Sequence, residues 1–188
     1  MKNLSVCINL VSAFLLNVLA NIIINKRNQG ETMQNYDIIQ ANTVDLSDYR
    51  NFADYMLYGI IAFAIYNYNK LPVYTIIKLL TVFLIMRSVS VSVTSLHDCN
   101  KKRENKCQFT TSRAFTTGGC EDKMFSGHTI VTLILCYYLA RAFGNTYAAN
   151  VLFGAYAVTL SILSIVVRNH YTIDVLTAWV LFYFYHSK

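Results

Sequence analysis

Apolar residues along this chain gather in six blocks separated by short polar segments. The blocks span about residues 4–24, 54–69, 72–96, 128–144, 147–167 and 170–187. A helix of roughly 20 largely apolar residues crosses a bilayer core about 30 Å thick. A single short block could be a buried helix of a soluble protein, but six in succession favour membrane spans. The pattern therefore predicts an all-α, polytopic membrane protein in which residues 1–188 form a single six-transmembrane-helix bundle.

The first block also resembles a secretory signal peptide, because Lys2 precedes an apolar run. The run continues past Ala20 to Lys26, however, and has no clear cleavage site with small residues. We therefore expect a retained helix, and cleavage would leave the topology of the later spans unchanged.

Composition supports a membrane-embedded chain. Hydrophobic residues make up 55% and charged residues 14%, whereas soluble domains carry about 25% charged residues. The net charge of +6 could indicate nucleic acid, but the basic residues lie mostly in loops beside apolar blocks and form no basic helix face. Attraction to anionic lipid headgroups or phosphate explains this charge better, and no nucleic-acid partner is expected.

Six spans place both chain ends at one membrane face, and the polar segments 27–53 and 97–127 and the turn 168–171 at the other. His128 and His170 are therefore expected at the same face, although they are far apart in the sequence. Counting Lys and Arg alone would place that face in the cytosol. The cysteines of the 97–127 segment would favour an oxidising compartment if they paired, so the residues alone leave the orientation open.

The sequence His-Tyr-Thr-Ile-Asp at 170–174 contains the first candidate for chemistry. If the last helix begins near His170, then His170 and Asp174 lie one turn apart on one helix face. A carboxylate beside an imidazole fixes the ring tautomer and makes the other ring nitrogen a better nucleophile or base. The alternative is an interfacial hydrogen-bonded pair without catalytic function.

The second candidate is Ser126-Gly127-His128. Glycine allows the backbone to approach a ligand closely, and the N-terminus of the following helix favours a phosphate. His128 is then placed to protonate a leaving oxygen. The alternative is a helix cap, in which Ser126 or Thr129 closes the first turn.

Together the two motifs predict phosphoryl transfer without a metal or other cofactor. One histidine attacks phosphorus and the other handles the proton of the leaving group. Positive charge must stabilise the transition-state oxygens, and Arg87 and Arg168 are the candidates. Arg87 lies inside an apolar block, where the alternative is snorkelling to the interface. The cysteine and histidine spacings match no zinc-binding pattern.

At these residues the chain resembles the sphingomyelin synthase family, within the wider superfamily of type 2 phosphatidic acid phosphatases. The matching segments are CEDKMFSGHT at 120–129, HYTIDV at 170–175, MRSVSVSVTSL at 86–96 and, more weakly, VDLSDYRNFADYML at 44–57. The resemblance covers about residues 44–186, which would form the catalytic core.

The resemblance implies a ceramide cholinephosphotransferase of sphingolipid metabolism, which moves phosphocholine from phosphatidylcholine to ceramide and releases diacylglycerol. It implies a catalytic triad in which His170 is the nucleophile, Asp174 orients it and His128 is the acid and base. Substrate contacts are assigned to Arg87, Asp122, Ser126, Gly127 and Arg168. The implied partners are membrane lipids and the implied location is the Golgi or plasma membrane, with an extracytosolic active site. Homo-oligomerisation is left open.

Some residues depart from these patterns. Ser164 stands where the phosphatases have an arginine before the second histidine, and Arg87 is followed by Ser88 instead of proline. Both differences favour a synthase over a lipid phosphatase. Lys123 and Met124 replace tyrosine-rich residues usual in the synthases, which leaves the headgroup open. The alternatives are a lipid phosphate phosphatase or phospholipase C-type hydrolase, and a catalytically inactive lipid-binding membrane protein.

Overall fold

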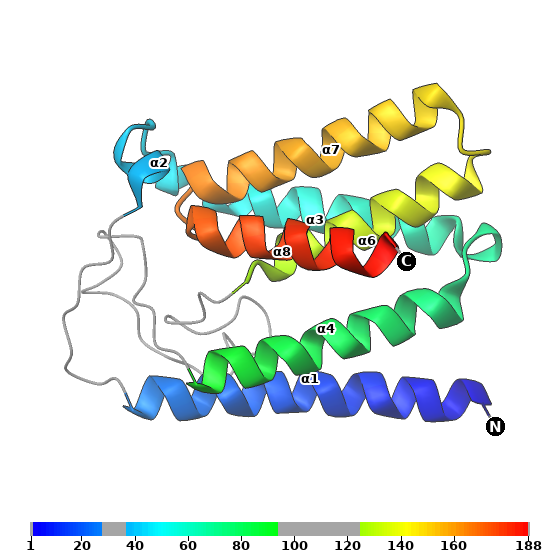
Figure 1. The fold of residues 1–188 in the computed structure, drawn as a ribbon, viewed down its shortest axis with the longest axis horizontal. Helices are drawn as coiled ribbons and strands as arrows, with labels where there is room; N and C mark the ends of the chain where they lie inside the picture. The colour runs from blue at the N-terminus through cyan, green and yellow to red at the C-terminus, as the bar shows by residue number, and fades with distance from the viewer. Residues whose placement is uncertain (1, 28–36, 94–124, 188) are drawn as a thin grey trace. The chain divides into compact units, whose positions relative to one another are not determined.

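The computed structural model describes residues 2–27, 37–93 and 125–187, and these residues form helices joined by turns (Figure 1). The α-helices are α1 (Lys2–Arg27), α2 (Ile38–Ala41), α3 (Arg50–Tyr66), α4 (Val73–Val93), α6 (Gly127–Ala142), α7 (Tyr147–Val166) and α8 (Thr172–His186). Short 3-10 turns span Ser47–Tyr49 and Tyr68–Lys70. Within the described residues the predicted all-α class is confirmed, and each of the six apolar blocks contains a helix.

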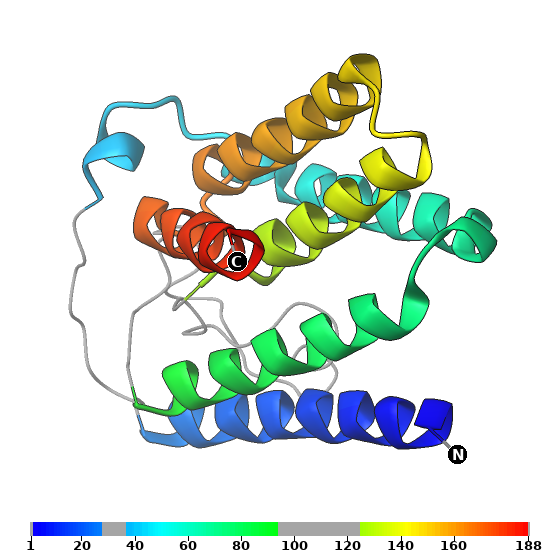
Figure 2. The ribbon, with the colours of Figure 1, turned by 45° about the vertical axis from the view of Figure 1, so that its right-hand side comes forward.

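The chain divides into two compact units. The first unit comprises residues 1–37 and 77–124, and its described helices are α1 and the larger part of α4. Figures 1 and 2 show these two helices running beside each other. Leu79 and Phe83 of α4 are buried there. Arg87, a predicted substrate contact, also lies in this part of α4.

The second unit comprises residues 38–76 and 125–188, and it contains both candidate histidine motifs. Helix α6 is at its centre, because it contacts α3, α7 and α8 and has more buried residues than any of these three helices. The side chains of Ile134 and Leu139 in α6 are 0% exposed, as the middle of a packed bundle requires. The N-terminus of α6, which carries His128, is therefore held by helices from three other parts of the chain.

Helix α6 starts and ends at defined local signals. The hydroxyl of Ser126 accepts a hydrogen bond from the Thr129 amide at 3.1 Å and caps the first turn. After Ala142, Gly144 and Asn145 have φ angles of 85° and 52°. These left-handed conformations end α6, so the chain reverses and enters α7.

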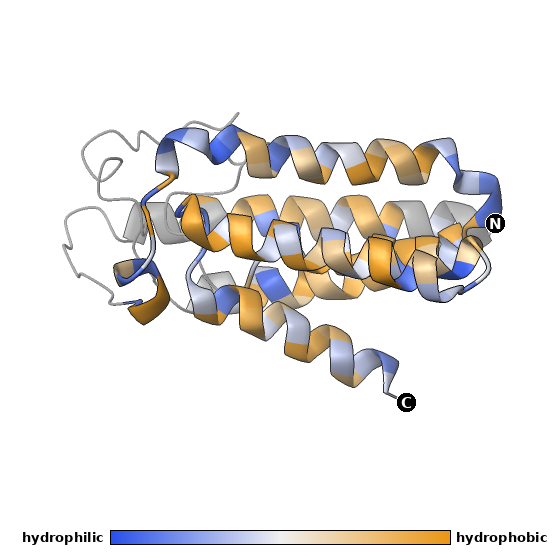
Figure 3. Cartoon of the chain, turned by 90° about the horizontal axis from the view of Figure 1, so that it is seen from above, coloured by the Kyte–Doolittle hydropathy of each residue, from blue (hydrophilic) through white to orange (hydrophobic). Residues whose placement is uncertain are grey.

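Two of the described helices are consistent with a membrane protein. Val73–Ser90 of α4 and Tyr147–Val166 of α7 are long and apolar enough to cross a bilayer, with mean hydropathies of 1.6 and 1.9. Figure 3 shows apolar residues along most of the helices. Leu152 and Ile162 of α7 are 66% and 56% exposed, which suits contact with lipid better than contact with water. The six-span topology stays a prediction.

Candidate active site

The turn between α7 and α8 places His170. Helix α7 ends at Val166, and the amides of Asn169 and His170 both donate to the Ser164 carbonyl, at 3.0 and 3.1 Å. Arg168, which lies between the end of α7 and Asn169, has a φ angle of 59°. This left-handed conformation is typical of helix ends. Helix α8 begins only at Thr172. The last helix thus begins near His170, and His170 itself lies in the turn just before its N-cap residue Tyr171.

Asp174 nevertheless reaches His170. Asp174 is the third residue of α8, and its Oδ2 accepts the Tyr171 amide at 2.9 Å. This backward reach to the helix cap also brings Oδ2 to 3.5 Å from His170 Nδ1. The separation exceeds the 2.7–3.2 Å of an ordinary N–H···O bond, but catalytic hydrogen bonds are often long before substrate binds. Nδ1 of His170 thus faces Asp174, and Nε2 lies on the other side of the ring.

His128 has its own carboxylate partner, Asp54 of α3. Nε2 of His128 lies 2.7 Å from Asp54 Oδ1, and the two side chains are 16% and 15% exposed. An ionised carboxylate only accepts hydrogen bonds, so Nε2 donates the proton. Sequence reasoning missed Asp54. The signal was a single acidic residue at the start of the apolar block 54–69, where a charge at the edge of a membrane helix needs a partner.

The two histidine–carboxylate pairs lie side by side. The ring centroids of His128 and His170 are 5.8 Å apart, with an angle of 63° between the ring planes. The Ser126 amide donates to the Asp174 carbonyl at 3.1 Å, which joins the start of α6 directly to the start of α8. The structure therefore brings together the three predicted triad residues, and Asp54 completes a four-residue cluster. Asp174 is 0% exposed and His170 is 5% exposed, so the cluster is shielded from water on one side.

The other predicted site residues are placed differently. Ser126 is 0% exposed and its hydroxyl caps α6, and Gly127 is the first residue of that helix. Arg87 belongs to the first unit, and Asp122 lies outside the described residues. Within the part of the chain that the structure describes, no group of three or more His, Cys, Asp or Glu side chains is arranged to hold a metal ion. The assigned substrate contacts stay predictions.

Arg168 is adjacent to the cluster and engages the segment before α3. Its Nη2 donates to the Thr43 carbonyl at 3.1 Å, and its Nε lies 3.9 Å from Asp45 Oδ1. The residue is 9% exposed. Its guanidinium therefore has a structural function. The predicted contact of Arg168 with phosphate stays a prediction.

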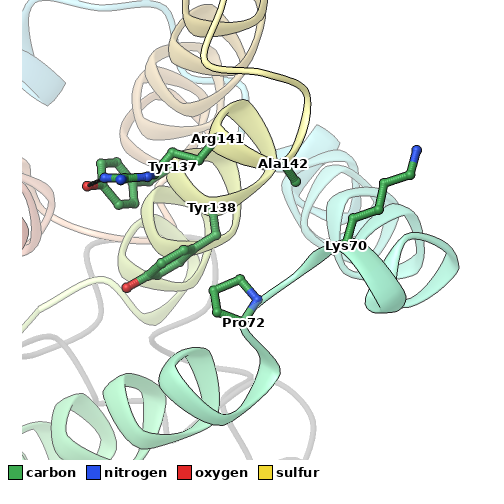
Figure 4. A pocket seen from close by; sticks show the side chains of 6 residues that line it. All are labelled: Lys70, Pro72, Tyr137, Tyr138, Arg141 and Ala142. Carbon is green, nitrogen blue, oxygen red and sulfur yellow. Dashed lines mark hydrogen bonds between the residues drawn. The ribbon is translucent and has the colours of Figure 1, made fainter.

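A cavity elsewhere in the second unit is not part of this site. It has a volume of about 450 Å³ and is lined by Lys70, Pro72, Tyr137, Tyr138, Arg141 and Ala142 (Figure 4). The two tyrosines, Arg141 and Ala142 lie in the C-terminal part of α6, roughly 14–21 Å along the helix axis from His128. Lys70 and Pro72 belong to the segment between α3 and α4. In Figure 4 Lys70 extends away from Arg141, so the two cations do not converge on one point.

Comparisons with known proteins show similarity over parts of this chain. Residues 119–187 match the family model described as "PAP2 superfamily C-terminal". A segment of 61 residues is 43% identical to "Phosphatidylinositol:ceramide inositolphosphotransferase 3" of Arabidopsis thaliana. That similarity covers 32% of this chain and 21% of the plant protein. No solved structure matches.

Proposed function

We propose that this protein transfers a phosphorylated headgroup from a glycerophospholipid to the hydroxyl of a ceramide-type acceptor, releasing diacylglycerol. The observation that carries the proposal is the pair of histidine–carboxylate contacts whose imidazoles lie 5.8 Å apart. The family match and the similarity to an inositolphosphotransferase support the broader class of lipid phosphotransferase or phosphatase. Because the similarity covers only part of the plant relative, that relative's full activity is only proposed for this chain.

In the first half-reaction Nε2 of His170 attacks phosphorus, and the bond between phosphorus and the diacylglycerol oxygen breaks. Asp174 faces Nδ1 and stabilises the positive charge that develops on the ring as the nitrogen bonds to phosphorus. His128 enters this step protonated and gives its Nδ1 proton to the leaving oxygen. Asp54 holds the Nε2 proton of His128 throughout. The products are diacylglycerol and a phosphohistidine that carries the headgroup.

In the second half-reaction the acceptor hydroxyl attacks the phosphohistidine. Neutral His128 takes the hydroxyl proton on Nδ1, and the bond between phosphorus and His170 breaks, which restores both histidines. The same residue thus gives a proton in one step and takes one in the next. The two rings are close enough for one phosphoryl group to contact both, since each needs to be only about 3 Å from its target atom.

The acceptor and the headgroup decide which enzyme this is. If water is the acceptor, the same four residues make a phosphatase or phospholipase C-type hydrolase. The resemblance to sphingomyelin synthases favours phosphocholine, and the relative's name favours phosphoinositol. We propose a ceramide-type acceptor with one of these two headgroups, and phosphocholine is the first to be tested.

The test is an assay of the purified protein with headgroup-labelled phosphatidylcholine or phosphatidylinositol, with and without ceramide. Labelled sphingolipid that forms only when ceramide is present supports the transferase and identifies the headgroup. Release of free phosphocholine or phosphoinositol regardless of ceramide would show a hydrolase instead. The proposal fails if neither product forms from either donor while the protein remains folded.

Replacing Asp54 by asparagine is expected to lower turnover about ten- to a hundredfold. Asparagine keeps the shape but loses the charge that supports protonated His128, so the proton-donating step slows. Turnover of labelled donor lipid, measured for wild type and variant under the same conditions, checks this effect.

The matched control is Asp48→Asn, an exposed carboxylate just before the same helix. It is expected to change turnover less than about twofold. Equal turnover in Asp54→Asn and wild type would show that Asp54 does not act on His128.

A further inference from the structure

Four residues that precede α3 contact the turn that carries His170. We call Gln40, Thr43, Asp45 and Leu46 the clamp. The side-chain amide of Gln40 donates to the His170 carbonyl at 2.8 Å and to the Ile165 carbonyl at 3.3 Å. The Leu46 amide donates to the Val166 carbonyl at 3.1 Å.

The other two clamp residues hold Arg168. Its guanidinium donates to the Thr43 carbonyl and faces the Asp45 carboxylate. A left-handed conformation is unfavourable for a residue other than glycine, so the φ of 59° at Arg168 needs support from surrounding contacts. The clamp contacts the turn on both sides of this residue and provides part of that support.

The clamp depends on these contacts for its own structure. Helix α2 has four residues, and a helix this short is not stable alone in water. Gln40 is 8% exposed, so its amide must find acceptors within the protein. One of the acceptors is the carbonyl of His170 itself, the residue whose ring faces Asp174. Anchoring that carbonyl restricts rotation of the backbone from which the imidazole projects.

We propose that the clamp positions His170 for reaction, and that Gln40 is the positioning residue through which it acts. The expected effect on turnover rests on the proposed function, whereas the placement of His170 by the clamp does not depend on it. The same stretch of chain runs from the clamp through Ser47–Tyr49 into α3, which carries Asp54. One continuous segment therefore contacts both histidines: the backbone of His170 through Gln40, and the ring of His128 through Asp54. Displacing this segment would alter the relation between the two imidazoles.

Replacing Gln40 by leucine removes the donor and keeps a side chain of similar size. The matched control is Asn42→Ala, which lies outside the clamp. The Asn42 amide donates at 2.7 Å to the Ile38 carbonyl of α2, the short helix that ends just before it. The first readout is the reaction of each histidine with diethyl pyrocarbonate, followed by peptide mass spectrometry on the purified protein. It requires no substrate and reports on the three described histidines separately.

In Gln40→Leu we expect His170 to react roughly tenfold faster than in wild type, because its backbone anchor is lost. His128 and His186 should react as in wild type, and Asn42→Ala should leave all three unchanged. General loosening of the fold would instead raise all three rates together, and this outcome would overturn the proposal. An unchanged His170 rate would overturn it as well.

The second readout is steady-state kinetics with the donor and acceptor identified by the transfer assay. Gln40→Leu should lower kcat about tenfold and change KM less than about twofold, because the loss affects the reacting geometry more than lipid binding. A rise in KM at unchanged kcat would contradict a positioning role. If wild type shows no turnover while His170 still reacts faster in Gln40→Leu, the proposed function fails and the positioning of His170 stands.

Discussion

Replacing His170 by alanine is expected to lower the rate of headgroup transfer at least about a thousandfold. Without Nε2 no covalent intermediate can form, and phosphorus would have to be attacked directly by the acceptor. The residual rate should come only from binding and from the other charged groups of the site. Transfer of labelled headgroup from phosphatidylcholine or phosphatidylinositol to ceramide measures the effect. Acid-labile label bound to the wild-type protein, and absent from the variant, would identify the intermediate.

His186→Ala is the matched control. This histidine ends α8 and packs against Tyr137 and Phe182, with ring centroids 4.2 Å apart in both pairs. It lies at the opposite end of α8 from Asp174, so its loss should change transfer by less than about threefold even if stability falls somewhat. A His170→Ala variant that transfers as fast as His186→Ala would eliminate His170 as the nucleophile.

Asp174→Asn is expected to lower transfer roughly a hundred- to a thousandfold while the fold is retained. The asparagine oxygen can still accept the Tyr171 amide at the start of α8, but the negative charge beside His170 Nδ1 is lost. The ring then lacks the group that stabilises its positive form during attack. Single-turnover formation of the phosphohistidine measures this step directly, and thermal unfolding measures the fold.

Asp174→Ala separates the two functions of this residue. It removes both the charge and the acceptor for the Tyr171 amide, so it should resemble Asp174→Asn in activity and be less stable, by about 1 kcal/mol. Full activity in Asp174→Asn, with loss of stability in Asp174→Ala, would show that the carboxylate serves only to cap α8.

The arrangement gives each histidine a carboxylate, and the two pairs differ in burial. His170 and Asp174 are almost completely buried, whereas His128 and Asp54 are partly exposed. A nucleophile benefits from exclusion of water, because water competes as an acceptor and would hydrolyse the phosphohistidine. An acid and base that serves two different lipid oxygens needs access to both. The difference in burial is thus consistent with the two proposed roles.

Local patterns predicted the helices and one of the side-chain contacts in the candidate site. The apolar blocks predicted the six long helices, because a run of apolar side chains is a local property of the sequence. Spacing also predicted that Asp174 would reach His170, and the helix that carries Asp174 begins near His170. The start of α8 depends on how α7 ends, and Arg168 in its left-handed conformation is part of that ending. Asp54 was missed because its partner His128 is distant in the sequence.

The sequence by itself determined the all-helical class, the apolar character of the long helices and the residue types able to transfer phosphorus. These properties follow from side-chain chemistry and from contacts within a few residues of one chain segment. Only the tertiary structure decided which carboxylate serves which histidine, because the contacts of Asp54 with His128 and of Gln40 with His170 join separate helices and turns. Such pairings depend on how helices pack around α6, and packing is fixed by the shapes of many side chains at once, which no local pattern contains.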